Sequence, residues 1–533
     1  MFDKTKLNRE LGVKVNATES SLLAYAIFAI LGLILYFIFP KKFKWVVLLV
    51  LSYAAIFFIS SYWAVFLIFA TIIVFSCALW IAHFNKVFEL KKQDLSKEDK
   101  KILKNKIKNR QKLILILGLI LSYLVLILLK YCDLPIYKLN HLFERHSIFK
   151  IMFPILGISY YTLQATGYLI DVYRNKYSAE KNIFKLALFI GFFPLQIEGP
   201  ICRYDKMQTL YKQTNPSYDD LSKGGIIILW GVFKKIVIAD RLNIAVAEIF
   251  KNYNEYAGPI LFVGGIFYAF QLYCDFSGYV DIARGVSKLF GIDLEQNFDR
   301  PFMSKTVSEF WRRWHMSLGA WLRDYVFYSV AFSKTYLKLT SKVHGRVKPV
   351  FEKLIVSSIP LFAVWLICGI WHGAGVKYIV YGMYYYVIMM IGILLEPVHI
   401  ALCNKLKLNR DGIFIKTLAI IRTFILVVFG LMLFRSNNVS EYFEILSRLF
   451  KGGKWDLVGF GLVNYKDLIL MIVSIVFILG LEIIEEFIPL KEKFYNSNIV
   501  LRWSLLFALV FIIVIFGAYG GSYGNVDPMY AAF

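Results

Sequence analysis

Long apolar runs separated by short polar stretches recur along the whole chain. A helix of about 20 apolar residues is long enough to cross the hydrocarbon core of a bilayer. By this rule the pattern predicts about 11 to 13 transmembrane or partial helices, and therefore an all-α polytopic membrane protein. The runs cover residues 20–39, 45–61, 64–83, 113–129, 151–170, 183–200, 224–238, 260–273, 355–371, 378–395, 413–434, 468–484 and 500–517.

The runs follow one another so closely that we expect a single membrane domain over residues 1–533. It would consist of N-terminal spans in 20–131, a central core in 151–435 and C-terminal spans in 466–519. The longest polar interruption, residues 293–353, is basic and rich in tryptophan, which favours interfacial helices. The first run is longer than the apolar part of a signal peptide, so we expect it to be retained as a span.

Basic residues indicate how the first spans are oriented. Residues 86–112 are densely basic and are expected in the cytoplasm, because Lys and Arg collect in cytoplasmic loops. Three spans precede them, so the chain would start outside and the basic loop 40–44 would lie inside. The next span would place residues 132–150 on the outer side.

Composition agrees with a multi-pass protein of the cell membrane. Hydrophobic residues make up 58% of the chain and charged residues 18%, where soluble domains carry nearer 25% charge. The formal net charge of +24 suggests nucleic acid as a partner. The loop positions of Lys and Arg explain the charge better, and they favour contacts with membrane lipids and no nucleic acid. The six cysteines show no Cys-x-x-Cys spacing, which argues against a zinc site or a disulfide framework.

Residues 310–325 predict a helix with two chemically different faces. Phe310, Trp314, Leu318 and Trp321 recur at helical spacing on one side, and Arg312 falls on the other. His315 lies within this segment. It is either a structural histidine that binds a neighbouring backbone or part of a site where Arg312 or Arg313 meets a phosphate-bearing acyl donor, and spacing alone does not separate the two.

His372 lies between two apolar runs, in the sequence Trp371-His372-Gly373. An ionisable residue at membrane depth is a candidate functional residue. A neutral imidazole suits general-base catalysis, although a histidine that bridges two helices by hydrogen bonds fits the position equally well. No second His or carboxylate follows at helical spacing, so a metal site is less favoured.

Two carboxylates, Asp275 and Asp281, stand in an apolar and aromatic run. Burying them is costly unless they are paired. They could orient a histidine, pair with Arg203 or Arg284, or break a helix. Structural pairing is the favoured role for at least one of them.

Taken together, these segments resemble the membrane-bound O-acyltransferase family, in its bacterial polysaccharide branch. Six stretches between residues 151 and 435 match its motifs in the same order. They are residues 157–173, 199–204, 275–283, 297–301, 310–325 and 371–373.

The resemblance implies a fold, a reaction and a set of site residues. The fold would be a ring of helices around a thin centre. A cytoplasmic thioester, such as acetyl coenzyme A, would donate an acetyl group to a hydroxyl on the outer side, with no bound cofactor and no metal. His372 would be the catalytic base and His315 a second catalytic position. The residues expected to contact substrates are Arg312, Arg313, Trp311, Asp275, Asp281, Arg203, Asp324 and Asn297.

Two branches of the family and one other class of protein remain open. The alginate O-acetylase type would act on an envelope or extracellular polysaccharide, or pass acetyl groups to a partner acetyltransferase. The double arginine at 312–313 and the sequence at 321–324 favour it over the teichoic acid D-alanyl transferase type. The sequence after Tyr325 departs from the family pattern, as does Glu198 beside the Gly-Pro at 199–200. A non-enzymatic transporter of a lipid-linked sugar is the third hypothesis.

Overall fold

The computed structural model describes residues 17–60, 64–131, 157–196, 198–211, 215–456 and 464–519. Helices account for nearly all regular structure in these ranges, which confirms the all-α prediction. The chain forms two compact units. Of the described residues, the first contains those in 17–228 and 283–295, and the second contains those in 229–282 and 296–519. The loop at 132–150, expected on the outer side, lies outside the described residues.

The membrane prediction is confirmed by the helices themselves. Nine helices in the described ranges are long and apolar enough to cross a membrane, and two shorter apolar stretches cover Tyr25–Ile38 and Ile183–Leu195. The nine are Lys41–Ile59, Ala64–Lys91, Lys97–Leu128, Gly258–Leu289, Pro349–His372, Val376–Lys405, Ile413–Arg435, Tyr465–Phe487 and Ile499–Phe516.

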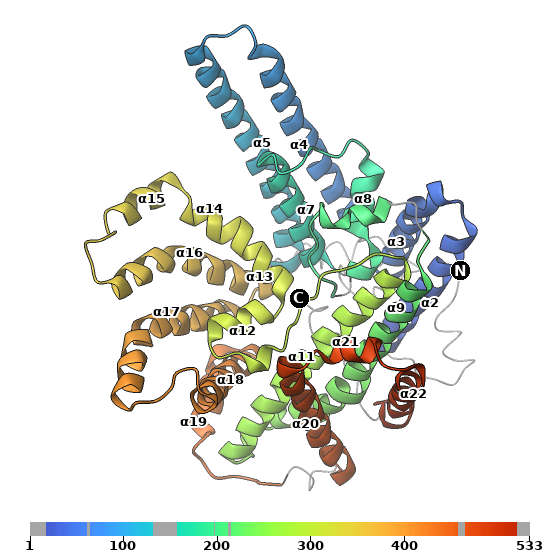
Figure 1. Cartoon of the computed structure of the whole chain (residues 1–533), viewed down its shortest axis with the longest axis vertical. Helices are drawn as coiled ribbons and strands as arrows, with labels where there is room; N and C mark the ends of the chain where they lie inside the picture. Colours follow the sequence, from blue (N-terminus) through green and yellow to red (C-terminus); the bar gives the residue numbers. More distant parts are fainter. Residues whose placement is uncertain are drawn as a thin grey trace, which may run out of the picture. The chain divides into compact units, whose positions relative to one another are not determined.

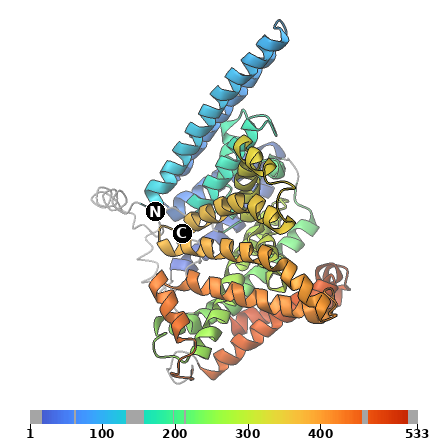
Figure 2. The same ribbon diagram turned by 90° about the vertical axis from the view of Figure 1, so that its left-hand side faces the viewer.

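The first unit is built on a long antiparallel hairpin of α4 and α5, which is plainly visible in Figures 1 and 2. The Ser96 side chain accepts a hydrogen bond from the Asp99 amide and so caps the start of α5. Deeper in the hairpin, Gln111 donates to the Ile81 carbonyl over 3.0 Å. The helices of this unit are α2 (Ala17–Ile38), α3 (Lys44–Ser60), α4 (Ala64–Lys91), α5 (Lys97–Tyr131), α7 (Ile158–Tyr173), α8 (Ile183–Gly191) and short 3-10 turns at Lys41–Phe43, Phe193–Leu195 and Lys206–Tyr211.

Two helices contribute residues to both units, α9 (Tyr218–Val232) and α11 (Gly258–Leu289). A π-helix, Phe233–Ala239, continues α9 into α10 (Asp240–Lys251). In the second unit α9 and α11 approach closely at two glycines. A Cβ atom added to Gly231 would lie 2.6 Å from the Gly278 carbonyl oxygen. Small residues at this crossing bring the π-helix against α11.

The other helices of the second unit follow α11. They are α12 (Val307–Arg313), α13 (Met316–Leu322), a π-turn at Arg323–Phe327, α14 (Tyr328–Ala331), α15 (Lys334–Ser341), α16 (Pro349–His372), α17 (Val376–Lys405), α18 (Ile413–Arg435), α19 (Val439–Arg448), α20 (Tyr465–Phe487), α21 (Leu490–Tyr495) and α22 (Ile499–Phe516), with a 3-10 turn at Pro301–Met303.

Helices α16 and α17 lie side by side in this unit (Figure 1). Their backbones touch at small residues, because a Cβ atom on Gly369 would lie 2.5 Å from the Tyr378 carbonyl oxygen. Close approach at glycines is the usual way in which membrane helices pack. The short turn between the two helices carries His372 at the end of α16.

Candidate active site

The segment predicted as one helix over residues 310–325 is broken at His315, so that prediction was wrong. Helix α12 ends at Arg313, and His315 adopts the left-handed conformation with φ 44° before α13 begins. The break is fixed by Asn297. Its carbonyl accepts from the Met316 amide over 2.9 Å, and its side-chain Oδ1 accepts from the Ser317 amide over 2.8 Å. These bonds come from a residue 18 positions earlier, which helical periodicity cannot reveal.

The His315 ring is buried and held from two sides. Its Nδ1 lies 3.2 Å from Asn297 Nδ2 and 3.3 Å from Oδ1. The ring meets Phe276 of α11 edge to face, with the centroids 4.7 Å apart. Burial lowers the pKa of His315 to about 3. The imidazole is therefore neutral at physiological pH.

His372 is also buried, with 2% of its surface exposed. Three aromatic rings meet its imidazole edge to face. Phe434 of α18 lies 5.2 Å away, Tyr381 of α17 lies 5.7 Å away and Trp371 lies 4.9 Å away, all measured between centroids. The adjoining Gly373 has extended backbone, so the helix stops immediately after the histidine.

Trp371 connects the two histidines. Its ring centroid lies 6.0 Å from that of His315 and 4.9 Å from that of His372. Two residues that the sequence suggested separately are thus neighbours of the same side chain in the second unit. Their catalytic roles remain a prediction.

Trp311 of α12 lies in an adjacent aromatic cluster. Its ring meets Trp365 and Tyr385 at 5.0 and 4.8 Å between centroids, and Tyr381 at 6.4 Å. Tyr381 therefore contacts both Trp311 and His372. These contacts place Trp311 beside the histidine cluster, and its predicted role in substrate binding is not decided by them.

The two adjacent arginines have different surroundings. Arg312 is exposed and donates to the Ser308 hydroxyl over 3.0 Å. Arg313 forms ion pairs with Glu309 at 2.8 Å and with Glu486 at 3.2 Å. Burial alone would lower the pKa of Arg313, but the two carboxylates raise it above its usual value. Arg312 is the better placed of the two to meet an anionic ligand.

Asp275 and Asp281 pair with lysines of the π-helix. Lys235 Nζ lies 2.6 Å from Asp275 and 2.7 Å from Asp240. Lys234 Nζ lies 2.7 Å from Asp281 and donates to Ser277 over 2.8 Å. The expected structural pairing is present, but α11 is not broken at these residues. The sequence reasoning missed both lysines, although two cations inside an apolar run signalled that carboxylates must lie nearby.

Two other residues were predicted to contact substrates. Asp324 lies in the π-turn after α13 and pairs with the adjacent Arg323 over 3.2 Å. Arg203 belongs to the first unit. Substrate contact by either residue stays a prediction. Within the described residues, no group of three or more His, Cys, Asp or Glu side chains is arranged to hold a metal ion.

Residues 174–396, which include both histidines, match the model of the membrane-bound O-acyltransferase family. The chain is 31% identical to a probable alginate O-acetylase of Pseudomonas syringae over 64% of this chain and 61% of that protein. It is 30% identical to a peptidoglycan O-acetyltransferase of Helicobacter pylori over 63% and 64%. It is 33% identical to a teichoic acid D-alanyltransferase of Bacillus subtilis over 54% of this chain and 70% of that protein.

The matches to the alginate and peptidoglycan proteins span less than two thirds of those proteins' own length. The match to the Bacillus subtilis protein passes that share, and the family model covers the segment that carries both histidines. This multi-pass membrane chain belongs to the membrane-bound O-acyltransferase family.

Proposed function

We propose that the chain transfers an acetyl group from a cytoplasmic thioester to a hydroxyl group of an envelope or extracellular polysaccharide on the outer side of the membrane. The observation that carries the proposal is the meeting of His315 and His372 on the ring of Trp371, inside the segment that matches the family. A buried imidazole at such a place is equipped to move a proton between two substrates.

His372 is the proposed general base. Its imidazole nitrogen takes the proton of the acceptor hydroxyl as the oxygen attacks the thioester carbonyl. A carbon–oxygen bond forms, and a tetrahedral intermediate follows. The carbon–sulfur bond then breaks, and the proton passes to the departing thiolate, which leaves as a thiol. The aromatic rings of Phe434 and Tyr381 exclude water from the base and so protect the thioester from hydrolysis.

His315 is proposed to stabilise the developing oxyanion. Oδ1 of Asn297 accepts from the Ser317 amide, and we assign the amide nitrogen of Asn297, 3.2 Å from Nδ1 of His315, as the donor to that ring nitrogen. The ring proton then lies on Nε2. In this tautomer a neutral His315 donates a hydrogen bond to the carbonyl oxygen of the thioester.

The relatives support acetyl transfer to a carbohydrate polymer. An alginate O-acetylase and a peptidoglycan O-acetyltransferase both match the chain over more than half its length. Arg312 is the proposed contact for the phosphates of a donor such as acetyl coenzyme A, because its guanidinium is exposed whereas that of Arg313 is held by two carboxylates. The final acceptor is either the polysaccharide or a partner acetyltransferase that passes the group on.

D-alanyl transfer to teichoic acid is the second candidate. It is favoured by the match to the Bacillus subtilis D-alanyltransferase. The same base chemistry serves both acyl groups. Mass spectrometry of the acyl group that mild base releases from the cell envelope separates the two, since one function yields acetate and the other D-alanine.

The test compares cells that make the wild-type chain with cells that make His372→Ala at equal protein level. We expect base-labile acetate on the polysaccharide to disappear in the variant. His344→Ala is the matched control, because the His344 side chain is 83% exposed and lies outside the cluster. Unchanged acetate in the His372→Ala cells would refute the role of this residue, and loss of sugar export rather than of acetate would favour a transporter.

A further inference from the structure

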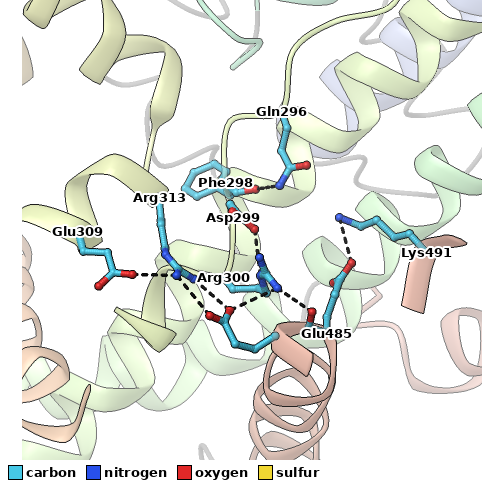
Figure 3. A network of polar contacts seen from close by, with 9 residues as sticks. Gln296, Phe298, Asp299, Arg300, Glu309, Arg313, Glu485 and Lys491 are labelled. Atoms are coloured by element: carbon cyan, nitrogen blue, oxygen red, sulfur yellow. Dashed lines mark hydrogen bonds and ion pairs between the residues drawn. The ribbon is translucent and has the colours of Figure 1, made fainter. Parts of the chain in front are cut away.

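Glu486, near the end of α20, joins two segments that flank His315. The arginines that these segments contribute, Arg300 and Arg313, are labelled in Figure 3. Its carboxylate pairs with Arg313 at 3.2 Å and with Arg300 at 3.3 Å. Arg313 is the last residue of α12, two positions before His315. Arg300 lies three residues after Asn297, the residue that binds His315, in the same loop between α11 and α12. One side chain of α20 therefore pairs with an arginine from each of the two segments beside His315.

These two backbone segments are also bonded directly to each other. The Asp299 amide donates to the Arg313 carbonyl over 2.9 Å, and the Met316 amide donates to the Asn297 carbonyl over 2.9 Å. His315 lies between these two bonds. The relative position of the loop and α12 consequently sets where the imidazole stands.

Each segment contains one residue in a backbone conformation that residues other than glycine rarely adopt. Both Arg300 and His315 have positive φ, at 46° and 44°, and neither is glycine. Such conformations cost on the order of 1–3 kcal/mol and persist only where the surroundings impose them. The charges around Glu486 supply such a restraint.

Arg300 has a second link to α20. Its Nη1 donates to the Glu485 carbonyl over 2.7 Å, at the end of the helix where carbonyl groups lack helical partners. A cation at a helix C-terminus is also favoured by the helix dipole. Glu309 completes the network on the side of α12 by pairing with Arg313 at 2.8 Å. The network thus fastens α12 and the Asn297 loop to the same end of α20.

From this geometry we infer that Glu486 is a positioning residue for His315, acting through Arg300 and Arg313 on the backbone on either side of it. The inference rests on the proposed function for its kinetic consequences. Removal of the Glu486 charge leaves both arginines less restrained and lets the two segments shift. A displacement of about 1 Å in a catalytic group can lower a rate by on the order of a hundredfold.

The first measurement is the rate of acetyl transfer by purified protein in vesicles, with acetyl coenzyme A as the donor. For Glu486→Gln we expect kcat to fall by about ten- to a hundredfold with KM changed less than about threefold, because the donor's contacts remain. Glu485→Gln is the matched control. Its carboxylate lies on the same turn with similar exposure, but it pairs only weakly with Lys491, at 3.6 Å. This control should keep kcat within about twofold of wild type.

The second measurement does not depend on activity. Diethylpyrocarbonate modifies accessible neutral imidazoles, and mass spectrometry reports each histidine separately. Exposed His344 serves as the internal reference. His315 should be modified slowly in wild type and in Glu485→Gln, and at least about fivefold faster in Glu486→Gln.

The third measurement places Glu486→Gln in a His315→Gln background. A residue that acts through His315 has no further effect on kcat once His315 is gone, whereas an independent role would multiply the two losses. The inference is overturned if kcat and His315 modification both stay within twofold of wild type, if Glu485→Gln behaves like Glu486→Gln, or if the losses multiply. Should Glu486→Gln fail to accumulate, Glu486→Asp is measured in the same way. A wild-type chain without transferase activity would refute the proposed function, and the modification experiment would still test Glu486.

Discussion

Lys235 pairs with two carboxylates at once, so its loss should destabilise the fold more than the loss of either partner. Its Nζ lies 2.6 Å from Asp275 and 2.7 Å from Asp240. The side chains of Lys235 and Asp275 are 2% and 1% exposed, and that of Asp240 is 13% exposed. Little water is available to solvate a carboxylate that loses this cation.

The expected magnitudes follow from which charges remain. Lys235→Met leaves two carboxylates without their cation, and breaking a buried pair in this way costs about 3–5 kcal/mol. Asp275→Asn leaves Lys235 paired with Asp240, and the new amide oxygen can still accept a hydrogen bond, so we expect a loss of about 1–2 kcal/mol. In the double variant, Lys235→Met with Asp275→Asn, Asp240 is the one carboxylate that has lost its pairing with Lys235. This protein should be more stable than Lys235→Met alone.

The assay is thermal unfolding of detergent-solubilised protein, followed by size-exclusion chromatography of a fluorescent fusion. Lys223→Met is the control, because its partner Asp219 is 66% exposed and surface pairs contribute about 0–1 kcal/mol. Equal destabilisation by Asp275→Asn and Lys235→Met would refute the reasoning. A fully stable Asp275→Asn protein that no longer transfers acetyl groups would instead assign Asp275 to substrate binding.

Three further predictions concern the site and the helix crossing. Asn297→Ala should lower kcat about ten- to a hundredfold, because His315 loses its orienting amide. Stability should fall as pH drops from about 6.5 towards 3, because the unfolded chain protonates His315 and the folded chain does not; His315→Gln should flatten this dependence by up to 1.36 kcal/mol per pH unit. Gly231→Ala should cost about 1–3 kcal/mol, because its Cβ meets the Gly278 backbone, whereas Gly225→Ala has open space and should be neutral or slightly stabilising.

Each of these three predictions has a result that would contradict it. Acetyl transfer by Asn297→Ala at the wild-type rate would show that His315 needs no amide partner. Identical acid-unfolding curves for wild type and His315→Gln would show that the buried ring is not kept neutral by the fold. Equal melting temperatures for Gly231→Ala and Gly225→Ala would contradict close packing at the crossing.

Sequence alone predicted the membrane-spanning helices well, because the length and apolarity of a span are local properties. It also identified Asp275 and Asp281 as costly charges that needed partners. The partners, Lys234 and Lys235, lie 40 or more residues away, and the pairing depends on how α9 and α11 cross. That crossing is a property of tertiary packing.

The contrast between local sequence properties and tertiary packing also explains which features of the site could be predicted. The side chains of the 310–325 segment have helical spacing, and periodicity therefore predicted one helix. Hydrogen bonds that the Met316 and Ser317 amides donate to Asn297 override this preference at His315. Glu486 had no local signal, because its partners Arg300 and Arg313 belong to segments about 170 residues or more earlier in the chain. Contacts that join distant segments are beyond any reading of spacing.

The paired lysines also have a consequence for how the chain enters the membrane during synthesis. Lys234 and Lys235 emerge from the ribosome before Asp275 and Asp281, their partners on α11. A lone charged side chain at the centre of a bilayer costs about 2.5–3.5 kcal/mol in insertion experiments. The two lysines therefore disfavour entry of the π-helix segment into lipid by itself, and we expect it to become stably placed only once α11 has been made. Between the synthesis of Lys235 and that of Asp281, we therefore expect this segment to depend on the insertion machinery.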